Sequence, residues 1–403
     1  MSADQRVAAV RQRTTSVEAF SAQVPMQRPF AHASHRRDMA DSVLVRCEID
    51  GFTGWGEGAP RPYVTGETSA GVLSALSSEN PALVLEELAQ AATFEDGVTR
   101  LARLDFPRLL GGAVRAPAAA AALETAALDA WCRLHDRPLR DALVAAAPPG
   151  TLLARPLVRP AALVVDLSRD PAGLLADLGE DAVGRLQHVK LKASADPYET
   201  AKAAELLSEA LPSEATLSVD ANCGWDADDA LVAAELLAPV VAWIEEPTVA
   251  RSWAVLRRIR ARTGARIMLD ESAVDVADLE TASTLQAADA VNIRISKCGG
   301  ILPALQLARR ADELGIGLQL GVQVAEVGPL WAAGRLLAAH LRDPLAIEAG
   351  RQDEWFPTPL TDPPYRIDRS HHLAPPLDGP GLGLVPSPEL LSCCRSAATT
   401  VQS

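Results

Sequence analysis

The sequence predicts an α/β fold in which an N-terminal α+β domain precedes a (β/α) barrel. From about residue 150 onward, eight short apolar runs alternate with amphipathic segments, as buried parallel strands alternate with their connecting helices. Charged residues end five of these runs at nearly equal intervals. Before residue 150, candidate strands come first and candidate helices follow, which is typical of a separate α+β domain.

The bulk composition bounds the class of protein. The chain has 403 residues, of which 48% are hydrophobic and 22% charged, so it can bury a large core in more than one domain. A formal net charge of −14 argues against nucleic acid or a membrane surface as partner. The six cysteines lack the spacing of a zinc site or of a disulfide framework. Because no apolar leader and no run of 18 apolar residues is found, we expect a cytoplasmic protein.

The N-terminal part is expected to hold a flexible tail at residues 1–12 and an α+β domain at 13–150. Alternation of apolar and polar residues predicts three strands, the last two joined by a glycine-bearing hairpin turn, and amphipathic helices follow. The strands are expected within 15–24, 42–49 and 50–58, and the helices within 70–145.

The barrel is expected over residues 151–360, followed by a C-terminal segment at 361–403. The candidate barrel strands cover 161–167, 188–193, 216–222, 241–247, 266–272, 290–297, 317–323 and 345–350. The C-terminal segment carries Gly379, Gly381 and Gly383, but no strand precedes them and no helix follows, so they do not predict a phosphate loop. A connection back to the N-terminal domain is the better interpretation.

The charged strand ends are the main functional signal. They are Lys192, Asp220, Glu245, Asp270 and Lys297, and neighbours among them lie 25 to 28 residues apart, the length of one βα unit. The carboxyl ends of barrel strands converge on one mouth, where active sites form. Buried charges are costly unless they are paired or bound to a metal. We therefore expect these five residues to form one site.

The three carboxylates of this set form an all-oxygen group of the kind that binds Mg²⁺, with Mn²⁺ as a substitute. The alternative is that such acids cap helices or form ion pairs in βα loops. Three acids in register, flanked by lysines, favour the metal site.

The lysines predict acid–base chemistry. Lys190 and Lys192 are two residues apart in a strand, so their side chains point to the same face. Two neighbouring ammonium groups beside a divalent cation should lower a lysine pKa toward neutrality, and a neutral lysine can act as a base. Lys297, placed on the sixth strand, would lie across the mouth. The alternative for Lys190 and Lys192 is a solvent-exposed pair, which the apolar flanking residues disfavour.

In combination, five motifs resemble the enolase superfamily and, within it, the muconate-lactonising-enzyme subgroup of the mandelate racemase/muconate lactonising enzyme family. They are KLK at 190–192, VDAN at 219–222, WIEEP at 243–247, LDES at 269–272 and NIRISKCGG at 292–300. The resemblance spans about residues 14–390. It implies a modified (β/α)7β TIM barrel, an N-terminal α+β capping domain, and a C-terminal segment that returns to the cap.

The resemblance also implies a role for individual residues. It makes Asp220, Glu245 and Asp270 the Mg²⁺ ligands. It makes Lys192 and Lys297 the acid/base groups on opposite faces of the substrate, with Lys190 and Asn222 in support. Glu246 and Glu271 stand beside ligands and, by strand alternation, should point elsewhere.

The implied reaction is removal of a proton alpha to a carboxylate, through an enediolate stabilised by Mg²⁺. Racemisation, epimerisation or cycloisomerisation of a small carboxylate substrate would follow, making the protein an isomerase and, by family habit, a homo-oligomer. A lyase of the o-succinylbenzoate synthase or dehydratase type is the alternative, and a non-catalytic barrel is a third hypothesis. The residues choose neither the substrate nor the second half-reaction.

Departures from the family's sequence patterns narrow the range of candidate substrates. The seventh strand ends near Gln323, without the histidine of the mandelate racemase subgroup. The eighth strand carries Glu348 alone, where dipeptide epimerases carry Asp-x-Asp, which weakens that assignment. Glu326 either reaches the substrate or caps the next helix. The basic segment 28–42 is expected to be a loop that either faces a second anionic group of the substrate or is simply solvated.

Overall fold

The computed structural model describes residues 13–32, 35–166, 170–348 and 351–402, so the tail predicted at 1–12 lies outside the described residues. An eight-stranded parallel sheet forms the larger domain, with its strands paired in chain order from β4 to β11. The strands are β4 (Leu163–Val165), β5 (His188–Lys192), β6 (Thr216–Asp220), β7 (Trp243–Glu245), β8 (Ile267–Leu269), β9 (Ala290–Ile293), β10 (Gly317–Leu320) and β11 (Ala346–Ile347). The N–H of Ala162 donates to the Ile347 carbonyl at 2.7 Å, which links the two ends of the sheet.

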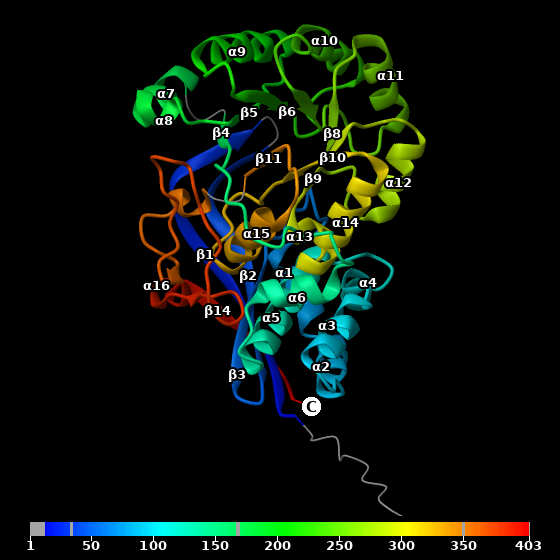
Figure 1. Cartoon of the computed structure of the whole chain (residues 1–403), viewed down its shortest axis with the longest axis vertical. Coiled ribbons are helices and arrows are strands. Elements are labelled where there is room, and N and C mark those ends of the chain that lie inside the picture. The colour runs from blue at the N-terminus through cyan, green and yellow to red at the C-terminus, as the bar shows by residue number, and fades with distance from the viewer. Residues whose placement is uncertain (1–12, 33–34, 167–169, 349–350, 403) are drawn as a thin grey trace, which may run out of the picture.

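Helices connect these strands and cover the outside of the sheet, where Figure 1 shows α9 to α12 in an arc. They are α7 (Pro171–Leu178), α8 (Glu180–Val183), α9 (Pro197–Ala210), α10 (Ala227–Leu237), α11 (Trp253–Thr263), α12 (Val276–Thr284), α13 (Ile295–Cys298), α14 (Ile301–Leu314) and α15 (Pro329–His340). Asp196, Asp226 and Asp275 accept hydrogen bonds from the first backbone N–H groups of α9, α10 and α12. These helix caps are acids other than those at the strand ends.

The cap is an antiparallel sheet in the order β14-β1-β2-β3, covered by helices (Figure 1). Its strands are β1 (Thr15–His32), β2 (His35–Ile49), β3 (Phe52–Gly58) and β14 (Cys394–Gln402). Its helices are α1 (Ser69–Leu76), α2 (Asn80–Ala89), α3 (Phe94–Ala102), α4 (Phe106–Gly111), α5 (Pro117–Leu134) and α6 (Leu139–Ala146). A Cβ atom added at Gly54, Gly56 or Gly58 would collide with the backbone of α5, so these glycines let the alanine-rich helix pack directly on β3.

The C-terminal part crosses from the barrel to the cap through short elements. They are η1 (Gln352–Trp355), β12 (Thr361–Asp362), β13 (Val385–Pro386) and α16 (Pro388–Ser392). The last strand, β14, pairs antiparallel with β1. The predicted α/β class, a barrel with an α+β cap, is confirmed. Among the described residues, no helix is both long enough and apolar enough to cross a membrane.

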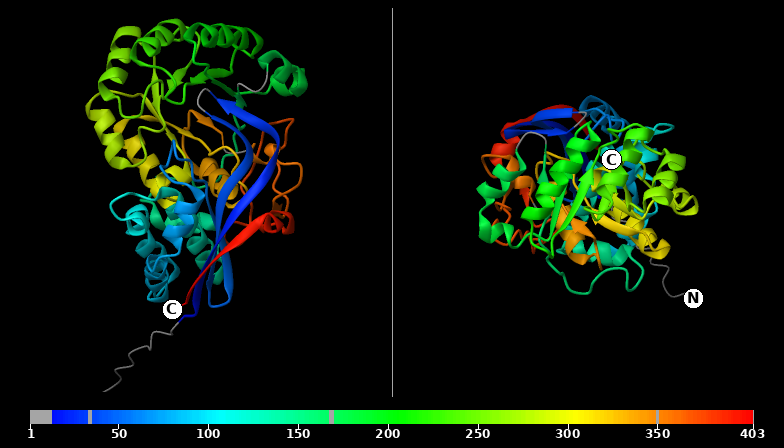
Figure 2. Two further views of the ribbon diagram at one scale, coloured as in Figure 1. Left: turned by 180° about the vertical axis from the view of Figure 1, so that it is seen from behind. Right: turned by 90° about the horizontal axis from the view of Figure 1, so that it is seen from above.

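The loop predicted at 28–42 was wrong. β1 continues to His32 and β2 starts at His35, with Phe30 opposite Arg37 and Ala31 opposite Arg36; residues 33–34 lie outside the described part. The polar segment is a strand because backbone pairing, not side-chain alternation, extends the hairpin. Figure 2 shows this blue hairpin rising from the cap along the side of the barrel. It brings Phe30 to the barrel mouth.

Candidate active site

Charged side chains gather at the carboxyl ends of the barrel strands. Asp220 and Glu245 are register partners on β6 and β7, and Lys192 on β5 is the register partner of Asp220. The side chains expected to form the site are all buried, with between 0% and 9% of their surface exposed. An exposed pair at Lys190 and Lys192 is therefore excluded.

The two lysines of β5 share one carboxylate. Lys192 Nζ lies 2.5 Å from Asp220 Oδ2 and donates to Asn222 Oδ1 at 2.9 Å. Lys190 Nζ lies 2.6 Å from Glu245 Oε2 and 3.7 Å from Asp220 Oδ2, and it also pairs with Glu348. Asn222 holds a left-handed backbone conformation, with φ of 46°, which asparagine tolerates better than most residues.

The carboxylates around Lys190 act on its pKa. Burial alone would lower the pKa of this ammonium, but the carboxylates of Glu245, Glu348 and Asp220 outweigh burial and raise it. The prediction considered the neighbouring lysine and a cation and left out Glu348. Conversely, burial would raise the pKa of Asp220, and Lys192 and Lys190 lower it instead. These carboxylates therefore favour the charged form of Lys190 at the inner end of the site.

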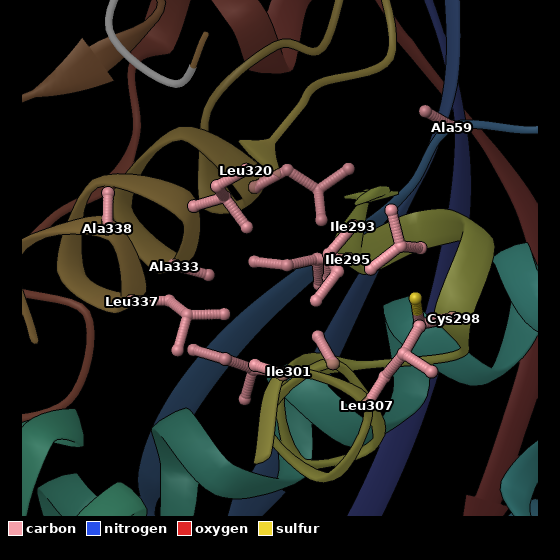
Figure 3. Packing of buried hydrophobic residues seen from close by; sticks show 14 of the residues in the cluster. Ala59, Ile293, Ile295, Cys298, Ile301, Leu307, Leu320, Ala333, Leu337 and Ala338 are labelled. Atoms are coloured by element: carbon pink, nitrogen blue, oxygen red, sulfur yellow. The ribbon is translucent and has the colours of Figure 1, made fainter. Parts of the chain in front are cut away.

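Lys297 lies elsewhere than expected. β9 ends at Ile293, and Lys297 stands on the short helix α13, which is anchored because Ile295 and Cys298 pack into the core (Figure 3). Its Nζ donates to Asp270 Oδ1 at 2.9 Å, to the Asp270 carbonyl at 2.6 Å and to the Asn292 carbonyl at 2.7 Å. The three hydrogens of the ammonium are thus directed at three acceptors, and burial lowers its pKa. Lys297 is not among the residues that line the cavity at the mouth.

Arg294, on the turn after β9, is the cation that lines this cavity on that side. Its guanidinium pairs with Asp270, lies 3.7 Å from Glu245 Oε1 and donates to Gln323 Oε1 at 3.4 Å. Within the described residues its Nε is buried without a hydrogen-bond partner. β5 and β9 are four strands apart in an eight-stranded sheet, so Lys192 and Arg294 face each other across the mouth.

The lining of the cavity combines apolar, aromatic and charged side chains. The cavity is lined by Arg28, Phe30, Ala162, Leu163, Val164, Lys190, Lys192, Arg294, Val322, Val324, Glu348, Arg351, Glu354 and Trp355. Phe30 and Trp355 meet edge to face, with ring centroids 5.3 Å apart. Arg28 pairs with Asp166, the acid that follows β4, at 3.0 Å. The site therefore offers cations at its inner end and an aromatic wall at its side.

The three strand-end carboxylates fit a hard cation by their chemistry. Asp220, Glu245 and Asp270 follow three adjacent strands and are almost fully buried. The helix caps described above are formed by other acids. Across the described part of the chain, no three acidic, histidine or cysteine side chains already stand in an arrangement that could hold a metal. Lys190 bridges Asp220 and Glu245, while Arg294 bridges Glu245 and Asp270.

The neighbouring acids turn away from the cavity, as strand alternation predicts. Glu246 accepts from the backbone N–H groups of Asp270 and Ser272, at 2.7 Å and 2.9 Å, and from the Ser272 hydroxyl at 2.5 Å. Burial raises the pKa of Glu246 and of Glu271. Neither residue lines the cavity.

Gln323 and Glu326 are also set back from the cavity. Gln323 touches it indirectly, through its contact with Arg294, and its Nε2 has no partner among the described residues. Glu326 accepts from the backbone N–H of Gln323 at 2.8 Å, so it stabilises the turn before α15. Glu326 does not line the cavity, and the side chain that accepts from the backbone N–H groups leading into α15 is Glu57.

The sequence reasoning missed Arg294, Phe30 and Trp355. Arg294 carried a usable signal: it follows Asp270 by 24 residues, closer than Lys297 to the spacing of 25 that separates the carboxylates. The two aromatic residues gave no local signal, because they meet across more than 300 positions of sequence.

Comparison with known proteins covers both domains. Residues 14–143 match the family described as mandelate racemase / muconate lactonizing enzyme, N-terminal domain, and residues 175–390 match the family described as Enolase C-terminal domain-like. The chain is 30% identical to an L-Ala-D/L-Glu epimerase of Escherichia coli, covering 79% of this chain and 88% of that protein. It is 26% identical to an N-succinyl-L-Arg/Lys racemase of Bacillus cereus, covering 77% of this chain and 80% of that protein.

Solved structures agree on the fold. The muconate lactonizing enzyme of Pseudomonas fluorescens, solved with muconolactone, superimposes with a TM-score of 0.78 at 24% identity, covering 95% of this chain and 99% of that one. A dipeptide epimerase of Cytophaga hutchinsonii, solved with Mg and D-Ala-L-Val, gives a TM-score of 0.76 at 22% identity, covering 95% and 98%.

Proposed function

Because the chain belongs to the mandelate racemase/muconate lactonizing enzyme family of the enolase superfamily, whose named relatives are isomerases, we propose that it isomerises a small carboxylate by moving the proton next to the carboxylate. One observation carries the proposal. Lys192 is a buried amine, 7% exposed, that lines a cavity together with Lys190 and Arg294, two buried cations able to receive an anion. An amine in that place is suited to proton transfer.

The residues of the mouth would divide the work. Lys190 and Arg294 would hold the substrate carboxylate at the inner end, leaving its alpha carbon beside Lys192. Asn222 accepts from Lys192 and would fix the direction of its amine. Phe30 and Trp355 would cover the apolar part of the substrate and exclude water.

Asp220, Glu245 and Asp270 are the residues that would hold Mg²⁺, or Mn²⁺ in its place. The bound cation would supply positive charge where negative charge develops on the substrate carboxylate. The Mg present in the Cytophaga hutchinsonii epimerase structure supports this choice of cation. Lys297, predicted as the second acid/base lysine, would help here by holding Asp270 in place. The cytoplasmic location and the homo-oligomer expected from the sequence remain predictions.

The test is exchange of the substrate alpha hydrogen with solvent deuterium, followed by proton NMR in D₂O with Mg²⁺. The probes are N-succinyl-L-lysine, L-Leu-L-Tyr and muconolactone, after the compounds named for the relatives. We expect exchange with at least one probe and its loss, by roughly 10³-fold, in Lys192→Met. Lys202→Met, at an exposed position of α9, is the matched control. Exchange that persists in Lys192→Met overturns the proposal.

The lyase alternative is distinguished by the product. Loss of water from the substrate would appear in the product mass, whereas isomerisation leaves the mass unchanged apart from deuterium.

A further inference from the structure

We propose that Arg294 takes the place opposite Lys192, and that a single amine therefore moves the proton on one face of the substrate only. The inference rests on the proposed function and deepens it. It predicts that the enzyme shifts bonds without inverting the alpha carbon, and so works as a cycloisomerase rather than as a racemase or epimerase.

The position of the two candidate cations carries the first step. Both follow β9, but only Arg294 lines the cavity, while Lys297 directs its hydrogens at Asp270 and a backbone carbonyl behind the cavity. For Lys297 to reach a substrate, its ammonium would have to leave these three acceptors. The cation that a substrate meets opposite Lys192 is a guanidinium.

The surroundings of Arg294 suit an anion-binding group. The side chain is 6% exposed, and its Nε is buried without a partner among the described residues. Its other contacts are to carboxylates that would turn toward a metal, and to Gln323. A guanidinium presents a planar pair of N–H groups that matches the two oxygens of a carboxylate. Arg294 would therefore hold the substrate rather than react with it.

The chemistry of arginine carries the second step. A guanidinium keeps its proton throughout the working range of enzymes, so it neither accepts the alpha proton nor readily donates one. When the alpha C–H bond breaks, the proton goes to the Lys192 amine and the electron pair stays on the substrate. Either the electron pair takes a proton back at the alpha carbon, or it forms a C=C bond while the C–O bond at the beta carbon breaks. The oxygen leaves as a carboxylate tethered in the same molecule, as in the opening of a lactone.

Inversion requires a second proton donor on the opposite face, and the cavity lining offers none there among the described residues. The same ammonium would return its proton or a solvent deuteron to the face from which it came. Exchange with retention, or ring opening of a lactone, is the expected outcome.

The first test compares wild type with Lys192→Met. Wild type with Mg²⁺ in D₂O is given L-Leu-L-Tyr, N-succinyl-L-lysine and muconolactone, and exchange and configuration are followed together by NMR and chiral chromatography. We expect muconolactone to be converted, and any exchange in the other two to proceed with retention. Inversion as fast as exchange overturns the inference and leaves the proposed function intact. Exchange that does not depend on Lys192 overturns the proposed function itself.

The second test measures binding and does not depend on turnover. Calorimetry with cis,cis-muconate and Mg²⁺ should show about tenfold or more weakening in Arg294→Met, because a charge-assisted pair is lost. Arg294→Lys should retain part of the affinity and gain measurable inversion of L-Leu-L-Tyr. Arg258→Met, exposed on α11, is the matched control. Unchanged muconate binding in Arg294→Met, with the control also unchanged, overturns the anchoring role.

Discussion

Two groups of buried carboxylates divide the molecule into a fixed part and a working part. In the cap, Glu57 and Glu124 accept hydrogen bonds from barrel backbone. Glu124 accepts from the N–H groups of Ile301 and Leu302 at the start of α14, at 3.1 Å and 2.8 Å. Glu57 accepts from the segment that leads into α15, at 2.6 to 3.3 Å. These acids bind the cap to the barrel.

At the mouth, Asp220, Glu245 and Asp270 are instead neutralised largely by side chains, Lys190, Lys192, Arg294 and Lys297, from other strands or turns. A backbone donor cannot move without deforming its helix, whereas a lysine or arginine can turn away when a ligand arrives. The difference teaches that burial of an acid alone does not indicate a ligand-binding site. A buried acid whose partners are displaceable side chains does indicate one.

Replacing one acid from each group should separate the two roles, and this gives the largest expected effect. Asp220→Asn should lower activity on the order of 10²-fold or more and abolish the rise in melting temperature that Mg²⁺ produces, because the site loses a charged ligand. Glu124→Gln should keep both. The measurements are the deuterium exchange assay and a thermal-shift titration with Mg²⁺. Equal losses in both variants would erase the distinction.

A steric test of the fixed part should give a medium effect. Gly300, with φ of 138°, faces Glu124 so closely that an added Cβ would lie 2.5 Å from its carboxyl carbon. Gly300→Ala should therefore lower the unfolding free energy by roughly 3 kcal/mol, from backbone strain and displacement of the carboxylate. It should leave the activity of the folded fraction nearly unchanged.

The control for Gly300→Ala is Gly315→Ala. Gly315 also has positive φ, 67°, but no atom lies within 4 Å of its added Cβ. The difference between the two melting temperatures isolates the contact with Glu124. If both variants lose the same stability, the contact contributes nothing and strain explains the whole effect.

Gly300 also shows what the sequence could and could not predict. The barrel strands were predictable because each is a buried apolar run, and Lys192, Asp220, Glu245 and Asp270 because each closes such a run at a regular interval. The motif CGG at 298–300 was visible too, but its contact with Glu124 joins positions 176 residues apart. No local pattern carries that information.

The sequence prediction assigned the second acid/base role to Lys297 and did not consider Arg294. Both cations stand within four residues of the strand end, and which one faces the cavity depends on where β9 stops and α13 starts. Arg294 precedes α13 in an extended backbone conformation, whereas Lys297 lies within the helix, so the two side chains leave the backbone in different directions. The polar strand over 28–42 was missed because its partners are set by pairing across the hairpin.

The smallest expected effect concerns pH and the fixed part. Burial raises the pKa of Glu124 to about 7, against the hydrogen bonds from Leu302 and Ile301, which lower it. A carboxyl group whose pKa is higher in the folded than in the unfolded protein stabilises the fold fully below its unfolded pKa. That contribution is lost as the pH rises through the folded pKa. The melting temperature of wild type minus that of Glu124→Gln should therefore fall, by a few degrees, between pH 5 and pH 8.

Taking this difference at each pH cancels the titration of the groups that both proteins share. Glu86→Gln, at an exposed position of α2, controls for the loss of one negative charge. A difference that rises with pH would mean that the backbone N–H groups of α14 favour the charged form more than burial disfavours it. Glu124 would then resemble the acids of the mouth, whose partners stabilise their negative charge. The contrast between the two regions would rest only on whether those partners can be displaced by a ligand.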